Sequence, residues 1–90
     1  MKVKYSPSFL TTVKKANVRI RKSLKERIDL FSKDPHNPQL NNHPLRDKYQ
    51  GYRSIDITSN WRAIYEEALV GSEAVAYFIA LGTHKELCGK

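Results

Sequence analysis

Side chains that can move protons or bind phosphate occur at three separated places in this 90-residue chain. His43 lies in a proline-rich loop, Arg53 and Arg62 lie in two short alternating runs, and His84 follows a long apolar run. An imidazole can give or take a proton near neutral pH, and a guanidinium stabilises a phosphate. Cleavage of RNA by its own 2′-hydroxyl needs a base, an acid and cations around the phosphate. These residues are therefore candidates for that chemistry.

Each candidate also has an ordinary structural interpretation. The histidines could be surface residues, and the arginines could form ion pairs across a sheet with Asp56, Glu66 or Glu67. Trp61, a candidate for stacking on a base, is more often a core or edge anchor. The residues alone leave both interpretations open.

Residues 49–66 form the element that must position these groups. Ile55 and Ile57 alternate with polar residues, which indicates a strand with one apolar face. Thr58-Ser59-Asn60 indicates a turn, and the mixture of residues in 61–66 suits a second, central strand. We expect a β-hairpin that carries charged residues among its apolar ones.

The segments before this hairpin predict a strand, two helices and a loop. Val3 and Tyr5 alternate with lysines, which indicates a first strand. Ser6-Pro7 begins a helix that ends near residues 16–17, and the apolar spacing over residues 18–33 predicts a second helix. The prolines and asparagines of residues 34–48 indicate a loop, which brings His43, Arg46 and Lys48 to the hairpin.

The last third predicts a buried strand and a helical turn. Residues 74–81 are apolar at consecutive positions, so we expect them in the middle of the sheet, with Ile79 and Leu81 alternating with Ala80. Thr83 and Glu86 have the spacing of a capping box, which places His84 in a first helical turn, where backbone N–H groups favour an anion.

These elements predict one α+β domain over residues 1–90. The expected order is β-α-α-β-β-β, with a small, mainly antiparallel four-stranded sheet, a two-helix hairpin packed on it and a short C-terminal helical turn. No apolar run reaches the length of a membrane span, and no signal peptide is recognisable. With one cysteine and no metal-ligand cluster, we expect a cytoplasmic protein without a metal or cofactor.

Positive charge is concentrated in the first third of the chain. Residues 1–33 hold ten Lys and Arg against two acidic residues, whereas residues 34–90 hold six against seven. This asymmetry favours a polyanionic partner, although a lysine-rich face can also serve solubility alone. The residues predicted to contact RNA on the helices are Lys14, Lys15, Arg21, Lys22 and Lys25.

Three motifs taken together resemble those of the RelE/ParE toxin superfamily. They are NHPLRDKYQGYRSIDI, NWRAIYE and IALGTHKEL, and they are most similar to the YafQ-like branch. The resemblance covers nearly the whole chain. It implies a type II toxin that cuts mRNA on the ribosome and is neutralised by a cognate antitoxin.

Matched position by position, the resemblance implies roles for four residues. His43 and His84 match the family's loop and C-terminal histidines, the candidates for acid and base. Arg62 matches a strand arginine of the related RelE toxins that stabilises the phosphate. Trp61 matches the tryptophan of the family's DW pair and would stack on a base. Asp56 would orient a neighbouring group. Arg53, Arg46 and Lys48 would contact RNA.

The chain departs from the YafQ-like pattern at four positions. Asp56 replaces a histidine, Asn60 an aspartate, Ala80 a strand arginine that faces the site, and Cys88 a terminal aromatic residue. Two alternatives therefore remain open: a ParE-like toxin that inhibits gyrase without cutting RNA, and a catalytically weak, small basic RNA-binding member of the fold.

Overall fold

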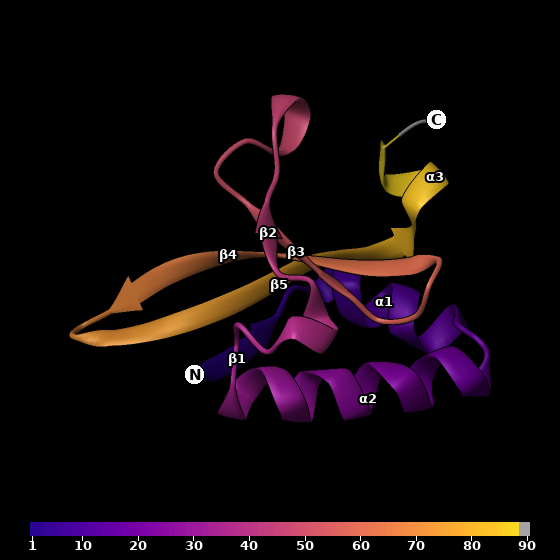
Figure 1. Cartoon of the computed structure of the whole chain (residues 1–90), viewed down its shortest axis with the longest axis horizontal. Coiled ribbons are helices and arrows are strands. Elements are labelled where there is room, and N and C mark those ends of the chain that lie inside the picture. Colours follow the sequence, from indigo (N-terminus) through magenta and orange to yellow (C-terminus); the bar gives the residue numbers. More distant parts are fainter. Residues whose placement is uncertain (89–90) are drawn as a thin grey trace.

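A five-stranded mixed sheet with two helices packed on one face forms the protein (Figure 1). The computed structural model describes residues 1–88, without the side chain of Cys88, so the departure at Cys88 lies outside the described side chains. The strand order is β1-β5-β4-β3-β2. The strands are β1 (Lys2–Tyr5), β2 (His43–Pro44), β3 (Arg53–Asp56), β4 (Trp61–Val70) and β5 (Glu73–Thr83).

The predicted α+β fold is confirmed, with one strand more than expected. β1 pairs with β5 in parallel and the other pairs are antiparallel, so β5 lies inside the sheet as predicted. The additional strand is the two-residue β2, which lies within the predicted loop. The loop also contains two 3-10 turns, at Pro38–Leu40 and Asp47–Tyr49.

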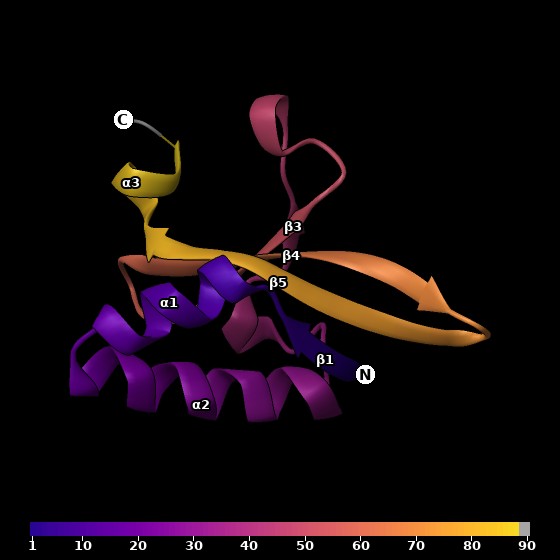
Figure 2. The same cartoon turned by 180° about the vertical axis from the view of Figure 1, so that it is seen from behind.

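Local capping explains where the two long helices, α1 (Pro7–Lys15) and α2 (Val18–Lys33), begin. The Ser6 hydroxyl accepts from the N–H of Phe9 at 3.0 Å, and the Asn17 side chain accepts from the N–H of Ile20 at 2.9 Å. The helices form an antiparallel hairpin beneath the sheet, as Figure 2 also shows from behind.

Aromatic side chains attach α2 to the sheet. Phe31 packs edge-on against Tyr65, with ring centroids 4.9 Å apart, and against Phe78 at 5.4 Å. All three side chains are fully buried. The core therefore occupies the helix side of the sheet, and the other face stays open for a site.

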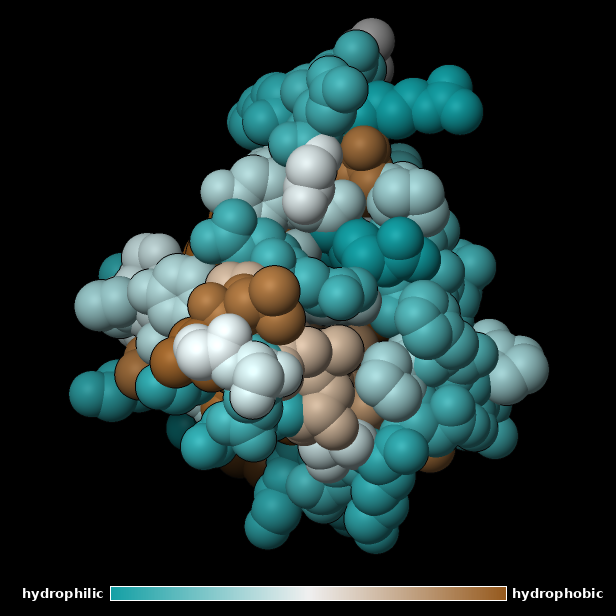
Figure 3. All heavy atoms as spheres, turned by 90° about the vertical axis from the view of Figure 1, so that its left-hand side faces the viewer, coloured by the Kyte–Doolittle hydropathy of each residue, from teal (hydrophilic) through white to brown (hydrophobic). Residues whose placement is uncertain are grey.

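Two features project from the sheet. The β2–β3 connection and α3 (His84–Cys88) rise on the face away from the long helices (Figure 1). The β4–β5 hairpin extends to one side, where Leu69 and Val70 are 76% and 57% exposed and apolar side chains gather on the surface in Figure 3. Among residues 1–88, no helix has the length and apolarity needed to cross a membrane.

Candidate active site

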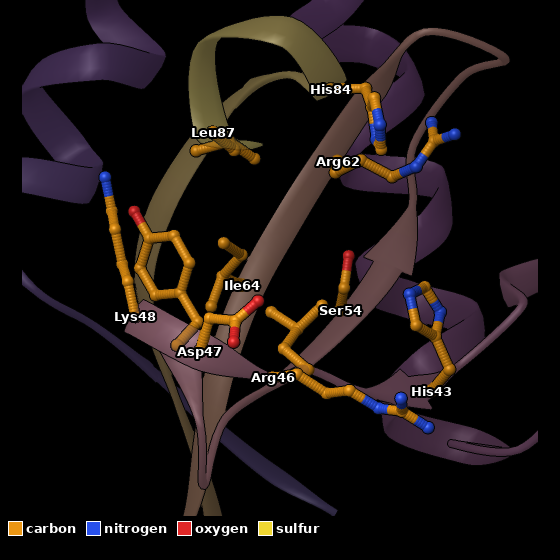
Figure 4. A pocket seen from close by; sticks show the side chains of 11 residues that line it. His43, Arg46, Asp47, Lys48, Ser54, Arg62, Ile64, His84 and Leu87 are labelled. Carbon is orange, nitrogen blue, oxygen red and sulfur yellow. The ribbon is translucent and has the colours of Figure 1, made fainter. Parts of the chain in front are cut away.

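A cavity of about 280 Å³ opens on the face of the sheet opposite the long helices (Figure 4). It lies between the 3-10 turn at Asp47–Tyr49 and α3. Its basic lining residues are His43, Arg46, Lys48, Arg62 and His84. The other lining residues are Leu45, Asp47, Tyr49, Ser54, Ile64 and Leu87. One acidic side chain stands among five that carry or can acquire positive charge, so the cavity suits an anion.

Strand register places the floor of this cavity. His43 pairs with Ser54, Ser54 with Ile64, and Ile64 with Ala80. Directly paired residues share a face of the sheet, so this row of four crosses β2, β3, β4 and β5 on the cavity side. Four segments that are distant in sequence thus meet in one row.

A β-bulge in β5 determines which residues face the cavity. The register passes from Ile64–Ala80 to Tyr65–Phe78, which leaves Ile79 as an extra residue. The predicted strict alternation of residues 74–81 is therefore wrong at this point. Because of the bulge, Ala80 turns to the cavity side and Leu81 joins Phe78 in the core.

Arg62 is fixed by contacts on two sides. Arg62 pairs with Asp56 across β3 and β4, and its Nε lies 3.0 Å from Oδ1 of Asp56. This carboxylate oxygen is buried, and within residues 1–88 it accepts no hydrogen bond of good geometry. Nη1 of Arg62 donates to the carbonyl oxygens of Thr58 and Ser59, both at 3.2 Å. The guanidinium is therefore anchored to the β3–β4 turn at the edge of the cavity.

His43 is oriented by a backbone carbonyl. Its Nδ1 lies 2.7 Å from the carbonyl oxygen of Asn41, a residue whose backbone is in the left-handed region (φ 48°). A carbonyl oxygen can only accept, so Nδ1 carries the proton in this contact. Nε2 of the neutral ring then has its lone pair available for a proton.

His84 begins α3 directly after β5. Its N–H donates to the carbonyl oxygen of Asn60 at 3.0 Å, which ties α3 to the β3–β4 turn. The predicted capping box is present, because the N–H of Thr83 donates to Oε1 of Glu86 at 2.8 Å and the N–H of Glu86 donates to the Thr83 hydroxyl at 3.1 Å. These bonds occupy the N–H groups of Thr83, His84 and Glu86, so the anion site expected at this helix start is not formed by them.

The structure does not bring every predicted site residue to the cavity. Trp61 and Arg53 alternate with Arg62 and Ser54, so both point to the other face of the sheet. Trp61 packs against the core there, and Nε of Arg53 donates to the Asn42 side chain at 2.8 Å. Five predicted basic residues are exposed on α1 and α2, the helices that cover the other face of the sheet (Figure 1): Lys14, Lys15, Arg21, Lys22 and Lys25.

Sequence reasoning missed Ser54 and Asp47 as lining residues. Ser54 is only 3% exposed and lies between its strand partners His43 and Ile64. The alternation that puts Ser54 on the same face as Asp56 is the sequence signal that could have identified it. Asp47 sits at a positive φ of 57° in a 3-10 turn, for which the sequence carried no clear signal. Within residues 1–88 no group of three or more His, Cys, Asp or Glu side chains could hold a metal.

Comparison with known proteins identifies the family. The sequence model described as "Bacterial toxin of type II toxin-antitoxin system, YafQ" matches residues 1–89. No match is found among the curated proteins.

Solved structures agree with this match. YafQ from E. coli strain BL21(DE3) superposes with a TM-score of 0.75 at 28% identity, covering 96% of each chain. The E. coli DinJ-YafQ complex gives 0.72 at 28% identity, again with 96% of each chain covered. The RelBE2 toxin-antitoxin complex from Mycobacterium tuberculosis gives 0.72 at 17% identity, with 92% and 96% covered, and shows the fold alone.

The predicted placement in the YafQ-like branch of the RelE/ParE superfamily is confirmed. So is the prediction of a type II toxin of the mRNA interferase kind, for which a cognate antitoxin is the expected partner. The family match spans the fold and the cavity together, because residues 1–89 include every element described above. This chain therefore belongs to the YafQ family of bacterial toxins of type II toxin–antitoxin systems.

Proposed function

We propose that this toxin cuts mRNA on the ribosome and that the cavity is its active site. The observation that carries the proposal is the meeting of His43, Arg62 and His84 around one anion-compatible cavity. These groups come from β2, β4 and the start of α3. They are the types that phosphodiester cleavage requires.

The reaction follows from the protonation states available to the two histidines. Nε2 of His43 takes the proton from the 2′-hydroxyl of RNA, because Nδ1 is engaged by the Asn41 carbonyl oxygen. The 2′-oxygen attacks the adjacent phosphorus as the bond from phosphorus to the 5′-oxygen breaks. His84 gives a proton to the leaving 5′-oxygen. The products are a 2′,3′-cyclic phosphate and a free 5′-hydroxyl.

Arg62 is assigned to the negative charge that develops on the phosphate. Asp56 holds Nε, and the turn carbonyls hold Nη1, so the guanidinium keeps one orientation before substrate arrives. Such preorganised donors are typically worth about 10²–10³ in rate each. Arg46 and Lys48, at the mouth of the cavity, would contact the RNA backbone. Trp61 and Arg53 have no contact with the cavity in this state, which weakens their assignment to RNA.

The test is induced expression followed by mapping of mRNA 5′ ends, for the wild type beside His84→Ala, His43→Ala and Arg62→Ala. Codon-phased cuts in the wild type that disappear in all three variants are expected. Lys85→Ala, next to His84 but outside the cavity, is the matched control and should cut normally. Wild-type cutting by His84→Ala and Arg62→Ala would show that the active site lies elsewhere.

A gyrase-inhibiting toxin without nuclease activity is the second candidate. The observation that favours it is Ala80, a small residue that pairs with the cavity-lining Ile64, at a position where the resemblance to YafQ-like toxins implies an arginine. Growth arrest without mRNA cuts, together with loss of gyrase supercoiling activity, would decide for this alternative.

The cognate antitoxin has a suitable surface on the helix side. A groove of about 250 Å³ between α1 and α2 has an apolar floor that includes Tyr5 and Leu10, which is 46% exposed. Its charged rim has two basic side chains, Arg21 and Lys25, and one acidic side chain, Asp29. We propose that an acidic amphipathic helix of the antitoxin lies in this groove, with its apolar face on Leu10 and its carboxylates on the rim cations.

The other three of the five predicted basic residues, Lys14, Lys15 and Lys22, would contact ribosomal RNA. The helices α1 and α2, which carry them, lie on the face of the sheet opposite the cavity (Figure 1), so the toxin would have RNA on two sides when it acts on a ribosome. An antitoxin helix on the same face would exclude the ribosome. We further propose that residues 1–90 act as one domain in the cytoplasm, where translating ribosomes are found.

A further inference from the structure

The side chain of Asn42, the residue just before His43, makes three hydrogen bonds. Its Nδ2 donates to the carbonyl oxygen of Pro35 at 2.8 Å and to the hydroxyl of Tyr65 at 2.7 Å. Its Oδ1 accepts from Nε of Arg53 at 2.8 Å. Both N–H groups of the amide and its oxygen are therefore used.

These bonds connect three parts of the fold. Pro35 follows α2, Arg53 begins β3, and Tyr65 lies in the middle of β4 with its side chain fully buried. Burial raises the pKa of the Tyr65 phenol above its ordinary value, while the hydrogen bond from Asn42 acts in the opposite direction. The phenol is thus a neutral and fixed partner for the amide.

Asn42 and His43 point to opposite sides of the sheet. The amide reaches Tyr65 and Arg53 on the helix side, whereas the imidazole lines the cavity on the other side. β2 has only two residues, so its pairing with β3 gives the loop little support of its own. The amide supplies an anchor one residue away from the imidazole.

We propose that Asn42 is a positioning residue that fixes the loop from behind the sheet and so sets the orientation and tautomer of His43. The link runs through the backbone: with Asn42 fixed, the Asn41 carbonyl oxygen stays 2.7 Å from Nδ1 of His43 and keeps the proton on that nitrogen. The catalytic role of His43 in this inference rests on the proposed function. The effect of Asn42 on the His43 tautomer does not depend on that function and can be measured separately.

Asn42→Ala removes all three bonds, and Tyr65→Phe removes one while keeping the aromatic packing of the core. The matched control is Gln39→Ala, which removes an exposed side-chain amide from the same loop and leaves the Asn41 carbonyl and the Asn42 side chain in place. Two readouts are needed. One is the ¹⁵N NMR spectrum of the His43 ring, and the other is single-turnover cleavage on programmed ribosomes across a range of pH.

In the wild type and in Gln39→Ala, neutral His43 is expected to carry its proton on Nδ1. In Asn42→Ala the ring should shift toward the Nε2–H form, and the cleavage rate at saturating ribosome should fall on the order of 10²-fold. Tyr65→Phe should show the same changes to a smaller extent. A purely structural role would lower the melting temperature without changing the tautomer in the folded protein.

An unchanged tautomer and rate in both variants, with His43→Ala inactive, would overturn the inference and leave the proposed function intact. Wild-type cleavage by His43→Ala would overturn the catalytic assignment of His43. The ring spectrum would then still decide whether Asn42 orients it.

Discussion

Asp56 and Arg62 face each other across β3 and β4, with Oδ1 of Asp56 3.0 Å from Nε of Arg62. Their side chains are 26% and 21% exposed, so the pair is partly shielded from water and from salt. At this position YafQ-like toxins are expected to have a histidine in place of Asp56. The departure therefore creates an ion pair that holds the proposed phosphate-binding group.

Asp56→Asn tests whether this pair orients Arg62 for catalysis. The amide keeps the shape of the carboxylate but loses its charge, so Nε is held less firmly while Nη1 stays bound to the turn carbonyls. We expect the single-turnover cleavage rate to fall about 10-fold, with little change in ribosome affinity. Glu66→Gln, a similar charge loss on β4 outside the cavity, is the control. A faster Asp56→Asn enzyme would mean that Asp56 restrains Arg62 instead of orienting it.

Ala80→Arg tests the departure with the largest expected effect. Ala80 pairs with Ile64, which lines the cavity, so an arginine there would start from the floor of the proposed site. An added donor to the phosphate should raise the cleavage rate by about 10-fold or more. Tyr77→Arg adds the same charge farther along β5, where Tyr77 pairs with Glu66, and should have no such effect. Equal gains in both variants would point to general attraction of RNA instead.

The sequence could predict the helices because their signals are local. The caps at Ser6 and Asn17 act within three residues, and the buried spacing of α2 needs only the helical period. The burial of β5 was equally readable, because an uninterrupted apolar run has no exposed face to occupy.

The cavity depended on long-range pairing that no local pattern specifies. The bulge at Ile79 reverses the facing of Ala80 and Leu81, and it is visible only once β4 and β5 are in register. Leu40 joins the core although its surroundings indicated a loop. The period-two alternation of β3 already separates Arg53 from Ser54, so the local pattern places these two side chains on opposite faces; the RNA contact predicted for Arg53 rested on its charge alone.

The capping box of α3 should respond to acid. Hydrogen bonding to the backbone N–H of Thr83, and to a smaller extent to the Thr83 side chain, holds the pKa of Glu86 below its ordinary value of 4.5. The folded state thus favours the carboxylate, so the box stabilises α3 fully above pH 4.5 and less as the pH falls through the lowered pKa. NMR titration of the Glu86 carboxyl carbon measures the pKa, and amide hydrogen exchange at Thr83 measures the stability of the capping box. In Glu86→Gln the exchange should lose this acid-dependent component, and a Glu86 that titrates at 4.5 or higher would contradict the expectation.

The basic helical surface should determine the salt dependence of ribosome binding. Each lysine that contacts a phosphate adds about one to the slope of log affinity against log salt. The double variant Lys14→Gln/Lys15→Gln is expected to lower that slope by about two while leaving cleavage at saturating ribosome unchanged. Lys2→Gln is the control, because Lys2 is paired with Glu73 at 3.4 Å. An unaltered slope in the double variant would exclude these lysines from the ribosome contact.

Leu10→Glu should separate neutralisation from catalysis. The substitution puts a negative charge on the apolar floor of the α1–α2 groove, where an acidic helix would have to lie, while the cavity is on the other side of the sheet. Antitoxin affinity should fall about 100-fold or more, since the variant adds repulsion and removes a buried apolar contact. Cleavage by the free toxin should be unchanged. Isothermal titration of toxin with cognate antitoxin measures the affinity.

Leu69→Glu is the control. It changes an equally apolar residue, 76% exposed on the β4–β5 hairpin, and should bind the antitoxin normally. Loss of binding in Leu69→Glu but not in Leu10→Glu would move the antitoxin from the groove to the hairpin.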